Sequence, residues 1–185
     1  MNKILWIIVV LSLFLFACTT QRPEYSRAEI FWDSYSQEFE QTVSVPINRS
    51  RSYIEFEGFG IGRSHVGTFD LWQGALLLYE YDIVGVNGII HAYTAKTEYP
   101  ALDTALRGFS FFHTEDNPYI TFNATYLTNE SMVGTLTLRG VSKNISFPAT
   151  VSGYVYAEFV LNISEFGIFY AGVDEDVRIT FSLMP

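Results

Sequence analysis

One cysteine and three histidines are the side chains of this sequence best suited to nucleophilic or metal chemistry. His65, His91 and His113 stand far apart, and none is paired at the short spacing typical of zinc or haem ligands. The sequence contains no G-x-S-x-G motif, P-loop or dinucleotide fingerprint. Residues 58–62 are glycine-rich, but no helix follows them, so a bend in a strand explains them better. The sequence therefore predicts no enzyme, no metal and no cofactor.

Cys18, the sole cysteine, directly follows a hydrophobic run over residues 4–17 that only Ser12 interrupts. Lys3 precedes the run, which is shorter than the ~20 residues of a bilayer-spanning helix and is typical of a signal peptide. Residues 15–18, Leu-Phe-Ala-Cys, resemble the lipobox of bacterial lipoproteins, except for Phe at the second position. The resemblance implies a signal peptide over residues 1–17 and a lipid anchor on Cys18. The alternative is a buried thiol behind an ordinary cleavage site.

The net negative charge of the chain restricts the kinds of molecule that it can bind. The chain has 11 basic and 20 acidic residues, and removal of residues 1–17 takes away only Lys3, so the net charge changes from −9 to −10. This acidity opposes binding to nucleic acid or to anionic lipid headgroups, so we expect the lipid anchor to hold the protein at a membrane. The lipobox resemblance implies the bacterial cell envelope, with the domain in the periplasm or at the cell surface. Thr19 is not the Asp that retains some lipoproteins at the inner membrane, so the outer membrane is favoured.

Composition divides the rest of the chain into two segments. Residues 18–42 are predicted to form a spacer or stem, because they begin with a polar stretch that contains a proline. One helical spacing lies within it, formed by Ala28, Trp32, Tyr35 and Phe39. That spacing favours a short helix, and a stem without helix is the alternative. Residues 43–185 suit a single β domain, since 17% of the chain is aromatic and β-branched residues are abundant.

The hydrophobic period in this domain is two. Apolar and polar residues alternate clearly in 119–126, 145–151 and 177–183, and more loosely in 86–94. Such alternation predicts strands with one buried and one solvated face. Turn residues punctuate the chain at 46–48, 85–88, 128–130 and 174–176.

One helix is predicted inside the domain, over residues 99–108. Leu102, Leu106 and Phe109 lie four and three residues apart, and Gly108 is expected to end the helix as a left-handed C′ residue. Several antiparallel strands with a single helical connection indicate a barrel or a sandwich. A barrel would remove the exposed edges that make so hydrophobic a sheet prone to aggregate.

Four sequence blocks resemble, in order and spacing, the YceI-like family of bacterial lipocalin-like β-barrels. The first joins SYIEF at residues 52–56 to HVGTF at 65–69 and Gly74. The others are LRGFSFF followed by PYITF at 106–112 and 118–122, GTLTLRGVSK at 134–143, and FGI at 166–168. The resemblance covers roughly residues 43–184. It implies an all-β, extended antiparallel lipocalin-like barrel of about eight strands, with one short helix in a connection.

The resemblance also implies a function. Members of this family bind amphiphiles with long tails, such as polyprenyl chains or fatty amides, so we expect a membrane-anchored lipoprotein that carries or sequesters an isoprenoid or similar lipid in an apolar tunnel. A dimer is compatible with the resemblance. A barrel of eight strands can hold one ligand or be filled by its own side chains. The candidate tunnel residues are Phe56, Phe69, Phe111, Phe112, Phe122, Leu136, Phe147, Phe166 and Phe181.

Two questions remain open: whether the barrel is filled by its own side chains, and which headgroup a ligand carries. The tunnel candidates can simply pack a filled core, in which case the protein is a structural or interaction lipoprotein that acts through its outer surface, for example the strand with Tyr154 and Tyr156. For a charged ligand headgroup, Arg107 and Lys143 are the candidate partners, since an Arg binds phosphate with two parallel hydrogen bonds. The alternative for Arg107 is a surface ion pair with Asp103, four residues before it. Asn162-Ile163 replaces the family's frequent Asp-Arg, so a neutral-headed lipid is the competing ligand.

Overall fold

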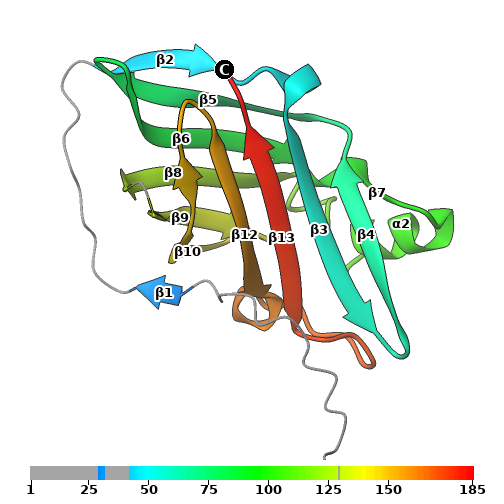
Figure 1. Cartoon of the computed structure of the whole chain (residues 1–185). Coiled ribbons are helices and arrows are strands. Elements are labelled where there is room, and N and C mark those ends of the chain that lie inside the picture. The colour runs from blue at the N-terminus through cyan, green and yellow to red at the C-terminus, as the bar shows by residue number, and fades with distance from the viewer. Residues whose placement is uncertain (1–28, 32–41, 129) are drawn as a thin grey trace, which may run out of the picture.

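The computed structural model describes residues 29–31, 42–128 and 130–185 (Figure 1). Cys18, the predicted signal peptide and most of the predicted stem lie outside these residues. The described chain forms two antiparallel sheets that curve round a common interior, with a short helix packed beside residues 95–97. The prediction of an all-β antiparallel fold with one helical connection is confirmed.

The first sheet has seven strands. Their order is β1 (Glu29–Phe31), β10 (Val141–Pro148), β9 (Ser131–Leu138), β8 (Tyr119–Leu127), β6 (Asp82–His91), β5 (Trp72–Tyr79) and β2 (Val43–Pro46). The register shifts between Leu77 and Leu78 in β5 and between Ala124 and Tyr126 in β8. Such irregularities bend a strand and increase its twist, which helps this sheet to curve round the interior.

The second sheet has six strands. Their order is β11 (Thr150–Val151), β12 (Val155–Asn162), β13 (Asp176–Leu183), β3 (Tyr53–Gly60), β4 (Arg63–Phe69) and β7 (Ala95–Thr97). Over both sheets, the described residues form nine strands of at least seven residues and four shorter segments. The expectation of about eight strands therefore counted the long strands nearly correctly and missed the short ones.

The predicted helix is present as α2 (Pro100–Arg107). Proline at its first turn fixes a helical φ without losing a hydrogen bond, and Leu106 is buried in the core on the inner face of the helix. Gly108 has φ −72° and ψ 172°, so it is extended and not left-handed as predicted. Three short 3-10 turns complete the secondary structure of the described residues: η1 (Arg49–Arg51), η2 (Ala92–Thr94) and η3 (Ile163–Phe166).

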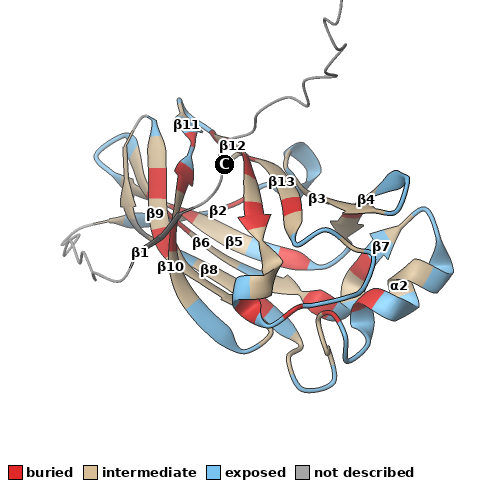
Figure 2. Ribbon diagram, turned by 90° about the horizontal axis from the view of Figure 1, so that it is seen from below, coloured by how far each residue is buried: buried red, intermediate tan, exposed pale blue. Residues whose placement is uncertain are grey.

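Alternation along the strands decides which side chains enter the interior. In β12, Val155, Ala157, Phe159 and Leu161 are buried, and the residues between them are partly exposed. Figure 2 shows buried residues recurring in this way along strands of both sheets. Burial of each large apolar side chain contributes about 1.5–3 kcal/mol, so these inward rows are the main source of stability.

Two further local predictions were wrong. Residues 85–88, expected to form a turn, lie inside β6, and the chain turns instead between Tyr79 and Asp82. Gly85 allows the close packing of Leu77, whose Cδ1 would lie 3.1 Å from a Cβ at residue 85.

The second error concerns the stem. Residues 29–31 of its predicted helix form strand β1, which pairs with residues 144–146 of β10. The open edge of β10 offers backbone hydrogen bonds that outweigh a short stretch of helical spacing. The rest of that predicted helix lies outside the described residues.

Gly134 in β9 provides a test of this packing. A Cβ at this position would lie 2.6 Å from the carbonyl oxygen of Asn123 and 2.5 Å from the ring of Phe122. Because the backbone cannot move aside without cost, we expect Gly134→Ala to lower the free energy of unfolding by about 1–3 kcal/mol in urea denaturation.

The matched control is Gly58→Ala in β3, where a Cβ would meet nothing within 4 Å. This variant should leave the free energy of unfolding unchanged or raise it slightly, because alanine restricts the unfolded chain. Equal losses in the two variants would contradict the packing argument.

Candidate functional site

The interior between the two sheets contains a cavity of about 250 Å³. Inward-facing side chains of both sheets, α2 and the loop after it form its wall, and almost all of the surface facing the cavity is apolar. An apolar cavity of this kind excludes ordered water, since a water molecule needs two to four polar partners. The space is therefore suited to an apolar chain.

Two groups of aromatic rings in mutual contact form part of the wall. The first group joins Phe56 of β3, Phe69 of β4 and Phe112, with ring centroids 5.2–6.3 Å apart. The second group joins four strands, through Phe122, Phe147, Phe159 and Phe181, with neighbouring centroids 4.1–6.5 Å apart. Tilted, edge-on and offset contacts of this kind add to the free energy gained from burial.

Glycines beneath two of these rings help to keep the space open. A Cβ at Gly67 would collide with the ring of Phe56, and one at Gly134 would collide with Phe122. Each ring therefore lies across a glycine of the neighbouring strand. A larger residue at either position would push the ring towards the cavity.

Eight of the nine predicted tunnel residues line the cavity: Phe56, Phe69, Phe111, Phe112, Phe122, Leu136, Phe147 and Phe181. The ninth, Phe166, lies at the end of η3, where it is fully buried and is not part of the cavity wall. Phe166 does not reach the cavity because its side chain is packed in the hydrophobic core, where it anchors η3. Contact of these side chains with a ligand stays a prediction.

Neither predicted headgroup residue lines the cavity. Arg107 is exposed and donates a hydrogen bond to the carbonyl oxygen of Ala95 at 3.3 Å. Its expected partner Asp103 instead accepts hydrogen bonds from the backbone N–H and hydroxyl of Thr97, at 2.7 and 2.8 Å. Lys143 forms an ion pair with Glu165 at 3.0 Å. A role of Arg107 or Lys143 in binding a headgroup stays a prediction.

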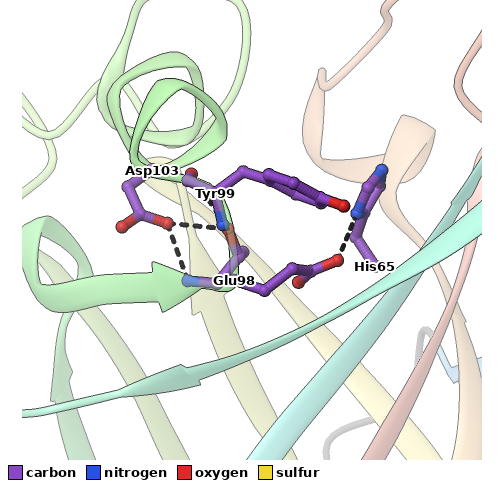
Figure 3. A network of polar contacts seen from close by, with 5 residues as sticks. His65, Glu98, Tyr99 and Asp103 are labelled. Atoms are coloured by element: carbon purple, nitrogen blue, oxygen red, sulfur yellow. Dashed lines mark hydrogen bonds and ion pairs between the residues drawn. The ribbon is translucent and has the colours of Figure 1, made fainter.

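A polar pair that the sequence analysis did not single out lies at the wall of the cavity. His65 of β4 lines the cavity, and its Nδ1 lies 2.7 Å from Oε1 of Glu98, in the turn between β7 and α2 (Figure 3). The ring of Tyr99 meets the imidazole edge-on at 5.4 Å. The hydrogen bonds from Thr97 to Asp103 hold this turn in place.

The hydrogen bond from His65 lowers the pKa of the Glu98 carboxyl below its ordinary value of 4.5. A backbone hydrogen bond and the positive charges of His65 and Arg63 act in the same direction, while partial desolvation opposes them. Glu98 is therefore ionised at neutral pH. The sequence analysis missed the pair because 33 residues separate its members, and only the β4–β7 pairing brings them together.

Phe159 was missed for a different reason. It lies in β12 with its ring stacked on Phe147 at 4.1 Å. The outward residues Tyr156 and Val160 of that strand are themselves apolar. They obscure the period-two pattern that would have placed Phe159 in the interior.

Curved antiparallel sheets round an apolar cavity define a lipocalin-like β fold. The chain belongs to the YceI-like family, since the model of the YceI-like domain matches residues 46–184. The predicted family membership and fold class are thereby confirmed. No match to a curated protein was found.

Solved structures share the fold. BcnA of Burkholderia cenocepacia superposes with a TM-score of 0.68 at 15% identity, over 74% of this chain and 98% of BcnA. A polyisoprenoid-binding domain from Saccharophagus degradans, implicated in plant cell wall breakdown, gives 0.60 at 15% identity, over 75% of this chain and 95% of that domain. The YceI protein of Campylobacter jejuni gives 0.53 at 20% identity, over 63% of this chain and 82% of that protein. At these identities the likeness establishes the fold.

Within the described ranges, no group of three or more His, Cys, Asp or Glu side chains is arranged to hold a metal ion. No helix in the described part of the chain is long and apolar enough to cross a membrane.

The His65–Glu98 pair gives a prediction on pH. Because the pKa of Glu98 is lowered, the stabilisation from its ionised form is fully present above about pH 4.5 and is lost as the pH falls through the lower pKa of the folded state. We expect Glu98 to titrate below 4.5 in a carboxyl-carbon NMR titration, and His65→Ala to raise its pKa towards that value.

His113→Ala is the control, since His113 pairs with Asp116 and lies outside the cavity wall. It should leave the pKa of Glu98 unchanged. A Glu98 pKa at or above 4.5, or one that ignores His65→Ala, would show that the pair does not form in solution.

Proposed function

We propose that this protein binds a long-chain amphiphile, a polyprenyl or similar lipid, with its apolar tail in the cavity between the sheets. The observation that carries the proposal is the apolar cavity of about 250 Å³, whose wall offers almost no polar atoms. The protein would carry or sequester the lipid, and this role needs no catalytic step.

The energetics of the cavity support an occupant. Side chains that line an empty apolar cavity lose the van der Waals contacts that an occupant would provide, so 250 Å³ left empty costs stability. A tail in the cavity would recover this and gain ~0.8 kcal/mol for each CH₂ removed from water. A barrel filled by its own side chains would contain no such cavity, so the cavity favours a ligand over the purely structural alternative.

An isoprenoid is the first choice of tail because the domain of similar fold from Saccharophagus degradans is described as polyisoprenoid-binding. Family membership supports the same ligand class.

Membrane attachment through Cys18 is the second part of the proposal. The lone cysteine after a short hydrophobic run, with leucine three residues before it, supports a lipoprotein of the bacterial cell envelope, with the outer membrane favoured. At least two acyl chains give stable anchoring, which would keep the domain beside the bilayer that supplies its ligand.

Native mass spectrometry of the protein purified from cells without detergent tests ligand binding. We expect a homogeneous apolar ligand to co-purify, because the cavity wall gains free energy only from an apolar occupant. A ligand-free protein whose melting temperature ignores added long-chain lipids would overturn the proposal.

Leu136→Trp sharpens this experiment, because Leu136 lines the cavity and an indole there would fill part of it. This variant should lose most of the co-purified ligand. Thr137→Trp is the matched control, since the next residue of β9 points to the opposite face, where the hydroxyl of Thr137 lies 2.8 Å from that of Ser142. Equal ligand content in the two variants would place the ligand outside the cavity.

Cys18→Ser tests the anchor. Cleavage of a lipoprotein signal requires prior transfer of diacylglycerol to the thiol, so we expect an uncleaved precursor held in the membrane by residues 4–17. Fractionation and intact-mass measurement distinguish this product from mature protein. A Cys18→Ser protein that is cleaved and released would instead establish an ordinary signal peptide and remove the anchor.

A further inference from the structure

Two polar side chains of the cavity wall, those of Thr97 and His65, lie on the inward face and are held by hydrogen bonds. Alternation along the strands turns Glu55, Gln73 and Thr121 to the outer face, although these residues border the cavity. The hydroxyl of Thr97 is hydrogen-bonded to Asp103. This leaves His65 as the polar side chain available to a ligand. It lies on the same face of the sheet as Phe56, because its cross-strand partner Gly58 comes two residues after Phe56 in β3.

Open space lies beside His65. A Cβ at Gly58 would meet no atom within 4 Å, and Gly58 itself lines the cavity. The side chain of His65 is 24% exposed. The missing side chain at Gly58 therefore leaves room for a small group of the ligand next to the imidazole.

Glu98 determines which chemical group of a ligand can bind beside His65. A carboxylate only accepts hydrogen bonds, so the hydrogen bond between His65 Nδ1 and Glu98 Oε1 places a proton on Nδ1. In the neutral imidazole, Nε2 then carries the lone pair and accepts a hydrogen bond. Figure 3 shows the second ring nitrogen turned away from Glu98. The negative charge of Glu98 opposes a phosphate at this place, whereas a hydroxyl can donate to Nε2 without electrostatic cost.

We propose that the ligand is an uncharged long-chain alcohol, whose hydroxyl occupies the space at Gly58 and donates a hydrogen bond to Nε2 of His65. This inference rests on the proposed function and names the polar end of its ligand. Glu98 acts as a positioning residue, since it fixes the tautomer and orientation of His65. The headgroup therefore lies at the β3–β4 side of the cavity, whose wall includes neither Arg107 nor Lys143.

The wild-type protein tests this without any substitution. Three ligands with the same tail are compared at about pH 8: geranylgeraniol, its methyl ether, which cannot donate a hydrogen bond, and geranylgeranyl phosphate. We expect the alcohol to bind about three- to tenfold more tightly than the ether, as one net hydrogen bond provides, and more tightly than the phosphate.

Substitutions then locate the contact. His65→Ala should reduce the preference for the alcohol over the ether to about onefold, while His113→Ala, outside the cavity wall, should keep it. Glu98→Gln should weaken the preference and change the ring-nitrogen chemical shifts of His65, which report its tautomer. Gly58→Val should reduce binding of the alcohol because its side chain takes the hydroxyl's space, with thermal unfolding of each variant as the check on folding.

The outcomes separate this inference from the proposed function. Equal binding of alcohol and ether to the wild type, tighter binding of the phosphate, or a preference that survives His65→Ala would overturn the inference and leave lipid binding intact. Failure of all three ligands to bind the wild type would overturn the proposed function itself.

Discussion

Apart from His65, the positions of the long strands that line the cavity from the inner face carry apolar side chains or glycines, and the fold depends on how these two kinds of residue are combined. The rings of Phe56 and Phe122 lie across Gly67 and Gly134 of neighbouring strands, so that large side chains cover the sheet without reaching its centre. Bulges in β6 and β8 add the curvature that brings the two sheets round the same interior. Together these features enclose a wall of rings with an unfilled centre, which a uniformly packed core would not provide.

Much of this architecture follows from the sequence, because burial of one sheet face imposes a period of two. The strands around Phe122, Phe147 and Phe181 were predicted from that period, and α2 from the spacing of Leu102 and Leu106. Where outward residues are also apolar, as in β12, the pattern disappears although the strand is regular. The prediction for the segment before β2 failed for a different reason. Its three-residue strand is determined by the edge of β10 with which it pairs, and not by its own residues.

In the candidate site, too, one part could be predicted from the sequence and another could not. Its apolar wall was largely predictable, since inward positions of strands are also cavity positions. Its polar features were not, because they depend on contacts between distant segments. Arg107 looked well placed at the end of α2, yet its guanidinium donates to the Ala95 carbonyl oxygen. Asp103 instead accepts hydrogen bonds in the turn that carries Glu98. His65 looked like an isolated histidine, and only the pairing of β4 with β7 gives it a carboxylate partner.

With a lipid on Cys18, the pairing of β1 with β10 would limit how far the domain can move from a membrane. Only the residues between Cys18 and Glu29 would then separate the anchor from the folded sheet, of which β1 is part. Eleven peptide steps, fully extended, span at most ~40 Å, comparable to the thickness of one bilayer. A tether of that length keeps the domain in repeated collision with its own leaflet and prevents it from crossing a wide intermembrane gap. Exchange of lipid with a distant membrane would then require a second carrier, and this protein would serve as a local reservoir.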